Sequence, residues 1–136
     1  MDSQTKRPSF KKVLVIDDDE VDVYLTRRIL EESGFAEEIV TAFSTDEALS
    51  YLRNNKDEDD LPGFIFLDLN MPAKTGLDFL NEFSDFLKGE KPCPVSLLMN
   101  VVNTENEETK KAKEHPLIRY VIEKPLTKEK LMKIED

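Results

Sequence analysis

Five short apolar runs, separated by amphipathic stretches, constrain the fold of this chain more than any other feature of its sequence. The runs cover residues 13–16, 39–40 with Ala42, 64–67, 95–99 and 120–122. Charged side chains rarely interrupt them, which suits strands buried on both faces better than strands with one solvated face. The runs therefore predict five strands of a parallel sheet.

The stretches between the runs have the spacing of amphipathic helices. Val21, Leu25 and Ile29 recur every four residues, and a three-and-four spacing of apolar residues also runs through 48–52 and 77–87. A helix is thus expected after each strand. The expected boundaries are Gly34 at the end of the first helix, Thr45 at the start of the second, Asn103 or Thr104 as the cap of the fourth, and about Thr127 at the start of the fifth.

Alternation of strands and helices predicts a single doubly wound (βα)5 domain of the α/β class. Right-handed crossovers place helices over both faces of a parallel sheet. A length of 136 residues fits one such domain. We expect residues 1–11 to form a flexible N-terminal segment and residues 12–136 to form the domain, with no room for an output domain after Asp136.

The charge of the chain argues against two classes of partner. With 19 Lys and Arg against 29 Asp and Glu, the formal net charge is −10, so nucleic acid and anionic membrane surfaces are unfavourable partners. The single cysteine, Cys93, cannot form an intrachain disulfide, and no apolar segment resembles a signal peptide or a membrane span. A cytoplasmic location is expected.

Polar side chains follow the predicted strands where they end, and ligands of open parallel sheets bind at that edge. Asp17 and Asp18 follow the first strand, and Lys124 follows the fifth. Asp68 and Asn70 lie at the end of the third, and Met99 and Asn100 at the end of the fourth. We expect the carboxylates and the ammonium to converge.

Carboxylates held close together need a cation, and oxygen ligands favour Mg²⁺ or Mn²⁺ over zinc. A metal beside a carboxylate and a lysine suits phosphoryl transfer, in which cations neutralise the phosphoryl oxygens. Asp68 is the expected nucleophile, Asp17 and Asp18 the metal ligands, and Lys124 the point charge. Nucleotide binding is disfavoured because a Gly-rich phosphate loop is missing from the sequence.

Three segments together resemble the receiver domains of two-component response regulators: VLVIDDDE, FIFLDLNMP and EKPLT, which start at Val13, Phe64 and Glu123. The resemblance implies a flavodoxin-like fold with strand order 2-1-3-4-5. It further implies a signalling protein rather than an enzyme, with at most slow autodephosphorylation. Asp68 would accept a phosphoryl group from a histidine kinase or phosphotransfer protein, and a downstream protein would read the result. Mg²⁺ would be held by Asp17, Asp18, Asp68 and the main-chain carbonyl of Asn70, while Lys124 would contact the phosphoryl oxygens.

Two positions depart from the pattern of that family. The fourth strand normally ends in Thr or Ser, but Met99 stands there and Asn100 follows. The aromatic residue normally found three positions before the lysine is replaced by Val121, and Tyr120 precedes it. We therefore expect phosphorylation with an unusual conformational response, and the Asn100 amide is a candidate donor to the phosphoryl group.

Two other functions fit parts of the same sequence. A degenerate receiver could bind a partner independently of phosphorylation, as the altered Met99 and Val121 allow. A haloacid dehalogenase-like phosphatase would use Asp17 as its nucleophile, although 136 residues leave little room for the further motifs of such an enzyme. The phosphatase and the receiver differ in the nucleophile they require, Asp17 or Asp68.

Overall fold

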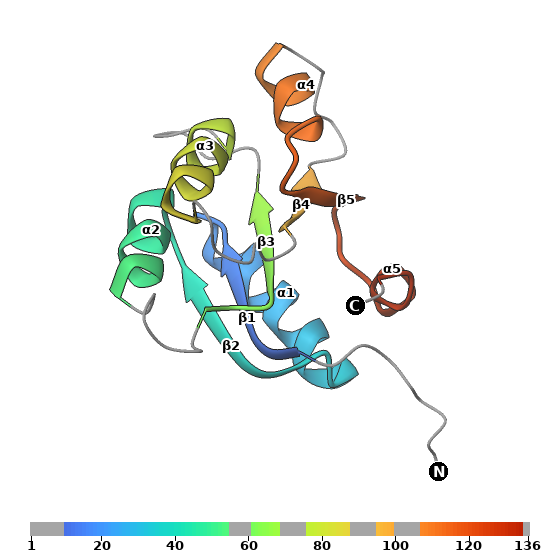
Figure 1. Ribbon diagram of the computed structural model, residues 1–136. Helices are drawn as coiled ribbons and strands as arrows, with labels where there is room; N and C mark the ends of the chain where they lie inside the picture. The colour runs from blue at the N-terminus through green and yellow to red at the C-terminus, as the bar shows by residue number, and fades with distance from the viewer. Residues whose placement is uncertain (1–9, 55–60, 69–75, 88–94, 100–106, 135–136) are drawn as a thin grey trace.

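Five parallel strands form the centre of the computed structural model, which describes residues 10–54, 61–68, 76–87, 95–99 and 107–134 (Figure 1). Neighbouring strands lie in the order β2-β1-β3-β4-β5. Their bounds are β1 Phe10–Ile16, β2 Ala36–Ala42, β3 Phe64–Asp68, β4 Val95–Met99 and β5 Ile118–Glu123. An α/β fold with a parallel sheet is thus confirmed.

A helix follows each strand, and several helix ends agree with the sequence. Gly34 ends the first helix in the left-handed conformation with φ 65°, which glycine adopts without steric strain. Thr45 begins the second, and Thr127 caps the fifth by accepting a hydrogen bond from the Lys130 amide. Asn103 and Thr104 lie outside the described residues. The helices are α1 Glu20–Ser33, α2 Thr45–Asn54, α3 Gly76–Leu87, α4 Glu107–Lys113 and α5 Lys128–Met132.

Strand register brings the predicted site residues to the same edge of the sheet. Ile16 of β1 pairs with Leu67 of β3, so Asp17, one residue further along, lies level with Asp68. In turn, β3 pairs with β4 and β4 with β5, where Glu123 is the last paired residue. Lys124 therefore leaves the sheet at the edge where Asp17 and Asp68 lie.

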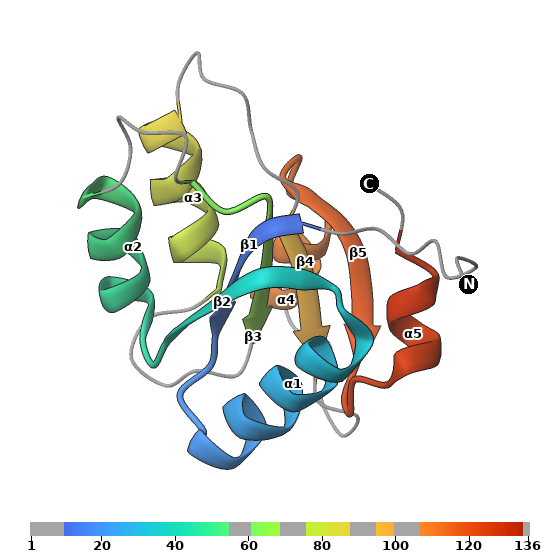
Figure 2. The same ribbon diagram turned by 90° about the horizontal axis from the view of Figure 1, so that it is seen from below.

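Apolar side chains fill both faces of β1 and β3. Along β1, Leu14 and Ile16 belong to a cluster with residues of α2 and α3, whereas Val13 and Val15 belong to a second cluster with residues of α1 and α5. Figure 2 shows α2 and α3 on one side of the sheet and α1 and α5 on the other. The two clusters thus pack against both faces of β1 and β3, the strands whose ends carry Asp17 and Asp68.

The expected burial on both faces is confirmed for β3 and for residues 13–16 of β1, and is wrong for the edge strands. All five residues of β3 are buried, but β2 and β5 are partly exposed, and Val121 of β5 is 45% exposed. The cause is position, because an edge strand has a neighbour on one side only and its flanking helices cover it incompletely. Runs without charge do not reveal which strands lie at an edge.

The four-residue spacing on α1 correctly predicts a helix, but two of the residues that carry it face solvent. Val21 is 64% exposed and Leu25 50% exposed, whereas the buried residues of the helix are Val23, Thr26 and Leu30. Thr26 contributes to the buried face of α1 although it is polar. A pattern of apolar residues alone therefore does not identify the face of this helix that packs against the sheet.

The described part of the domain begins two residues before the boundary expected from the sequence. Phe10 and Lys11 belong to β1, and the Phe10 ring lies 5.2 Å from Phe35 and 5.3 Å from Phe64, measured between ring centroids. This aromatic packing anchors the start of the strand. Residues 1–9 of the predicted flexible segment lie outside the described residues.

Within the described residues, no helix combines the length and apolar character that a membrane span requires.

Candidate functional site

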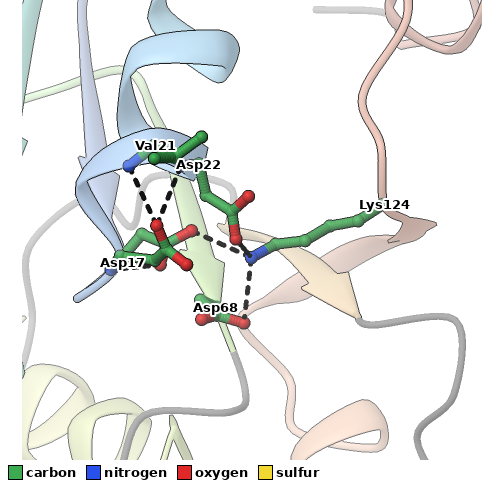
Figure 3. Close-up of polar contacts among 6 residues, drawn as sticks. Asp17, Val21, Asp22, Asp68 and Lys124 are labelled. Carbon is green, nitrogen blue, oxygen red and sulfur yellow. Dashed lines mark hydrogen bonds and ion pairs between the residues drawn. The ribbon is translucent and has the colours of Figure 1, made fainter.

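Asp17 is the residue at which β1 leaves the sheet. Its amide donates a hydrogen bond to the Ala42 carbonyl at 3.1 Å, which fixes the backbone just past the strand. The carboxylate is buried, and its Oδ1 accepts a hydrogen bond from the Asp19 amide at 3.0 Å. Its other oxygen faces Lys124 (Figure 3). Asp17 is thus a buried anion with fixed orientation.

Asp17, Asp18 and Asp68 form a cluster that could hold a metal ion. Each offers a carboxylate oxygen, and these oxygens lie within 4.8 Å of one another. Asp17 and Asp68 are buried, while Asp18 is exposed and leaves the cluster open to water. Three carboxylates with access to water fit Mg²⁺ or Mn²⁺, which keep several water ligands when bound to proteins. The donor set therefore agrees with the ligands expected from the sequence.

Asp68 is the last residue of β3 and is buried at the end of the central strand. Its Oδ1 lies 3.5 Å from the Lys124 ammonium, which makes an ion pair longer than an ordinary hydrogen bond. A carboxylate beside a cation and a metal-binding cluster can act as an oxygen nucleophile toward phosphorus.

Lys124 follows β5 and reaches across the sheet edge to three carboxylates (Figure 3). Its Nζ lies 2.9 Å from Asp17 and 2.8 Å from Asp22, and the side chain is 15% exposed. Burial alone would lower the pKa of Lys124, but hydrogen bonds to Asp22 and Asp17 and the charge of Asp68 outweigh it and raise that pKa above its ordinary value. Lys124 is therefore a permanent cation at the site.

Sequence reasoning missed Asp22, which lies on the first turn of α1. The Asp19 carboxylate caps this helix by accepting hydrogen bonds from the Val21 and Asp22 amides at 2.9 and 3.3 Å. The cap fixes where the helix starts and hence which way Asp22 points. An acid on the first turn of the helix that follows Asp17 and Asp18 was the available signal, but it could not reveal the contact with Lys124.

Lys130 was also missed and supports the backbone around Lys124. Its Nζ donates hydrogen bonds to the carbonyls of Glu123 at 2.7 Å and Pro125 at 3.0 Å. These carbonyls flank Lys124 on both sides. Lys130 thus ties the first turn of α5 to the segment that carries the site lysine.

The remaining predicted residues are only partly covered. Asn70 and Asn100 lie outside the described residues. Met99 ends β4 and pairs through its backbone with Glu123, and its side chain lies outside the described part of the chain. Tyr120 is half-buried against Phe64, with ring centroids 6.3 Å apart, and belongs to the α1 side of the core.

Comparison with known proteins agrees with this geometry. Residues 13–135 match the sequence profile of the response regulator receiver domain. A two-component response regulator from Cytophaga hutchinsonii has a similar structure, with a TM-score of 0.78 and 27% identity over 93% of this chain and 92% of that one. One from Legionella pneumophila has a TM-score of 0.73 and 29% identity, covering 90% and 93% of the two chains. The chemotaxis protein CheY4 of Vibrio cholerae has a TM-score of 0.68 and 25% identity, covering 90% and 93%. Among curated protein sequences, none matches this chain.

Proposed function

Because the chain belongs to the response regulator receiver family, we propose that it is a doubly wound, five-stranded receiver that accepts a phosphoryl group on Asp68 and signals by protein contact. One observation carries the proposal: Lys124 reaches from the fifth strand to Asp17 and Asp68, beside a cluster of three carboxylates. The proposed receiver domain starts at Phe10, where β1 begins.

The proposed step is a transfer of phosphoryl from a donor to the Asp68 carboxylate. An Asp68 oxygen attacks phosphorus, the bond between phosphorus and the donor atom breaks, and the donor leaves with that electron pair. Burial of Asp68 limits competing water, and Lys124 neutralises charge on the phosphoryl oxygens as they approach. Asp17 and Asp22 hold the Lys124 ammonium by hydrogen bonds and do not themselves react in this step.

Asp17, Asp18 and Asp68 would hold Mg²⁺ or Mn²⁺, with the Asn70 carbonyl as a further ligand. When bound, the ion would neutralise phosphoryl oxygens that Lys124 alone cannot reach. The closeness of the three carboxylates supports this assignment, because like charges at such distances repel unless a cation lies between them.

Family membership indicates the phosphoryl donor, and two altered positions bear on the conformational response to phosphorylation. A histidine kinase or a phosphotransfer protein would supply the phosphoryl group, and a downstream protein would bind the phosphorylated form. Met99 and Val121 replace the residues that usually couple phosphorylation to a change of shape. Val121 is 45% exposed and puts an aliphatic side chain where the family usually has an aromatic one. The conformational response would therefore depart from the usual one, with Asn100 as a candidate contact to the phosphoryl group.

Intact-protein mass spectrometry tests the proposal. The wild type and Asp68→Asn are incubated with acetyl phosphate, with Mg²⁺ and with a chelator. We expect a phosphoryl adduct only in the wild type with Mg²⁺. Asp85→Asn, an exposed acid on α3, serves as the matched control and should form the adduct. If the wild type forms no adduct under any condition, the function as a phosphoacceptor is wrong and the phosphorylation-independent binding module replaces it.

A further inference from the structure

Asp22 contacts Lys124 more closely than either of the two acids expected there. The Nζ to carboxylate distance is 2.8 Å for Asp22, 2.9 Å for Asp17 and 3.5 Å for Asp68. Figure 3 shows the Asp22 side chain descending from α1 toward the ammonium. Asp22 is not among the three clustered carboxylates that could hold a metal. Its partner within the site is therefore the lysine.

The start of α1 fixes Asp22 in that position. Asp19 caps the helix and accepts a hydrogen bond from the Asp22 amide, so the backbone of the first turn is held. The neighbouring acid Glu20 lies on the same turn but is exposed. Of these two carboxylates on one turn of the helix, Asp22 accepts a hydrogen bond from Lys124 at 2.8 Å.

Lys124 has three protons to donate, and two of them are already engaged in short hydrogen bonds. Asp17 and Asp22 take these two, while Asp68 lies 3.5 Å away. A phosphoryl group added to Asp68 brings further anionic oxygens that need the same ammonium. Asp22 and the phosphoryl group therefore compete for the lysine.

Asp22 is the partner that can release Lys124 at the lower cost. The Asp17 side chain is 1% exposed, so it would lose its cation in a site that water barely reaches. The Asp22 side chain is 37% exposed and lines a pocket of about 300 Å³ with Lys124 and Pro125, where water can replace the lysine. Transfer to Asp68 would thus draw the ammonium away from Asp22.

We propose that Asp22 is a positioning residue that competes with the incoming phosphoryl group for Lys124 and thereby slows phosphorylation of Asp68. This inference rests on the proposed function as a phosphoacceptor. It makes α1 a regulator of the reaction through its first turn, in addition to its structural part in the fold.

The test compares initial rates of adduct formation from acetyl phosphate with saturating Mg²⁺. Asp22→Asn keeps the shape of the side chain and removes its charge, and we expect it to raise the rate by about threefold, the size typical of a partly exposed ion pair. Glu20→Gln removes one charge from the same helical turn and should leave the rate unchanged. Asp22→Glu, which restores the charge, should return the rate toward that of the wild type.

A second pair of variants shows whether Asp22 acts through Lys124. In a Lys124→Gln background, Asp22→Asn should no longer change the rate, because the group for which it competes has gone. A rate difference that persists there would overturn the inference, as would an equal or slower rate in Asp22→Asn or an equal acceleration in Glu20→Gln. Absence of an adduct on the wild type would overturn the proposed function and this inference with it. An adduct that forms at the same rate in the wild type and Asp22→Asn would overturn this inference alone.

Discussion

Lys124 donates a hydrogen bond to Asp17 at 2.9 Å although the two residues are 107 positions apart in the chain. Asp17 follows the first strand and Lys124 the last, so the contact joins the two ends of the chain at one edge of the sheet. The same ammonium pairs with Asp68 from the central strand. The site therefore needs both the first and the last strand of the sheet in place.

Magnesium should stabilise the wild type through the exposed ligand Asp18. An ion that binds the folded cluster more tightly than the unfolded chain raises the melting temperature, by about 3–5 °C when Mg²⁺ is tenfold above its dissociation constant. Asp18→Ala should remove this shift and leave the metal-free protein folded, because the side chain is exposed. Thermal melts of the wild type and Asp18→Ala, each with Mg²⁺ and with EDTA, measure the Mg²⁺-dependent shift and the stability of the metal-free protein. A shift of equal size in Asp18→Ala would exclude Asp18 from the metal site.

Replacing Lys124 should destabilise the metal-free protein. Lys124→Met leaves the buried carboxylates of Asp17 and Asp68 without their cation, and we expect a loss of about 2 kcal/mol in the free energy of unfolding. Mg²⁺ should reduce this loss because it supplies positive charge to the same carboxylates. Urea unfolding with and without Mg²⁺ measures the difference.

Lys128→Met, an exposed lysine on α5, is the control for the loss of a positive charge and should stay within about 0.5 kcal/mol of the wild type. If both lysine variants were equally stable, Lys124 would not neutralise the buried acids.

The strand-end residues of the site could be predicted from sequence, whereas Asp22 could not. Asp17, Asp68 and Lys124 follow directly from where apolar runs stop, because parallel strands end at a common edge. Asp22 depends on the direction in which a capped helix leaves the sheet, which the cap at Asp19 decides in three dimensions. Apolar spacing identified α1 as a helix but marked Val21 and Leu25, which face solvent. The direction in which α1 leaves the sheet, and with it the position of Asp22, therefore could not be predicted from the sequence pattern.

Among the glycines at the described helix ends, Gly34 should be the one whose substitution destabilises the domain most. It ends α1 with φ 65°, and a Cβ at this position would meet no atom within 4 Å, so backbone strain is the whole penalty. Gly34→Ala should lower the free energy of unfolding by about 1 kcal/mol, and Gly34→Asn by less, since Asn tolerates the left-handed region better. Equilibrium unfolding of the three proteins measures this order. An alanine variant as stable as the wild type would contradict the account of the helix end.

The single histidine should make the domain less stable in mild acid. Burial lowers the pKa of His115 below its ordinary value of 6.5, and its Nδ1 accepts a hydrogen bond from the Leu117 amide at 3.2 Å, which only the neutral ring allows. The unfolded chain therefore binds the proton more readily, so the contribution of His115 to stability is complete above about pH 6.5 and is lost as the pH falls from there through the lower pKa of the folded state. An NMR titration of the ring measures the pKa, and His115→Gln should lessen the loss of stability between pH 7.5 and 5.5. A pKa above 6.5 would contradict the prediction.

The position of the phosphoryl group in the chain distinguishes Asp68 from Asp17 as the nucleophile. The wild type is phosphorylated with acetyl phosphate and Mg²⁺, the acyl phosphate is reduced with borohydride to homoserine, and tandem mass spectrometry of peptides locates the modified aspartate. We expect homoserine at position 68 and an unmodified aspartate at position 17. Homoserine at position 17 would contradict it and identify the nucleophile of a haloacid dehalogenase-like phosphatase.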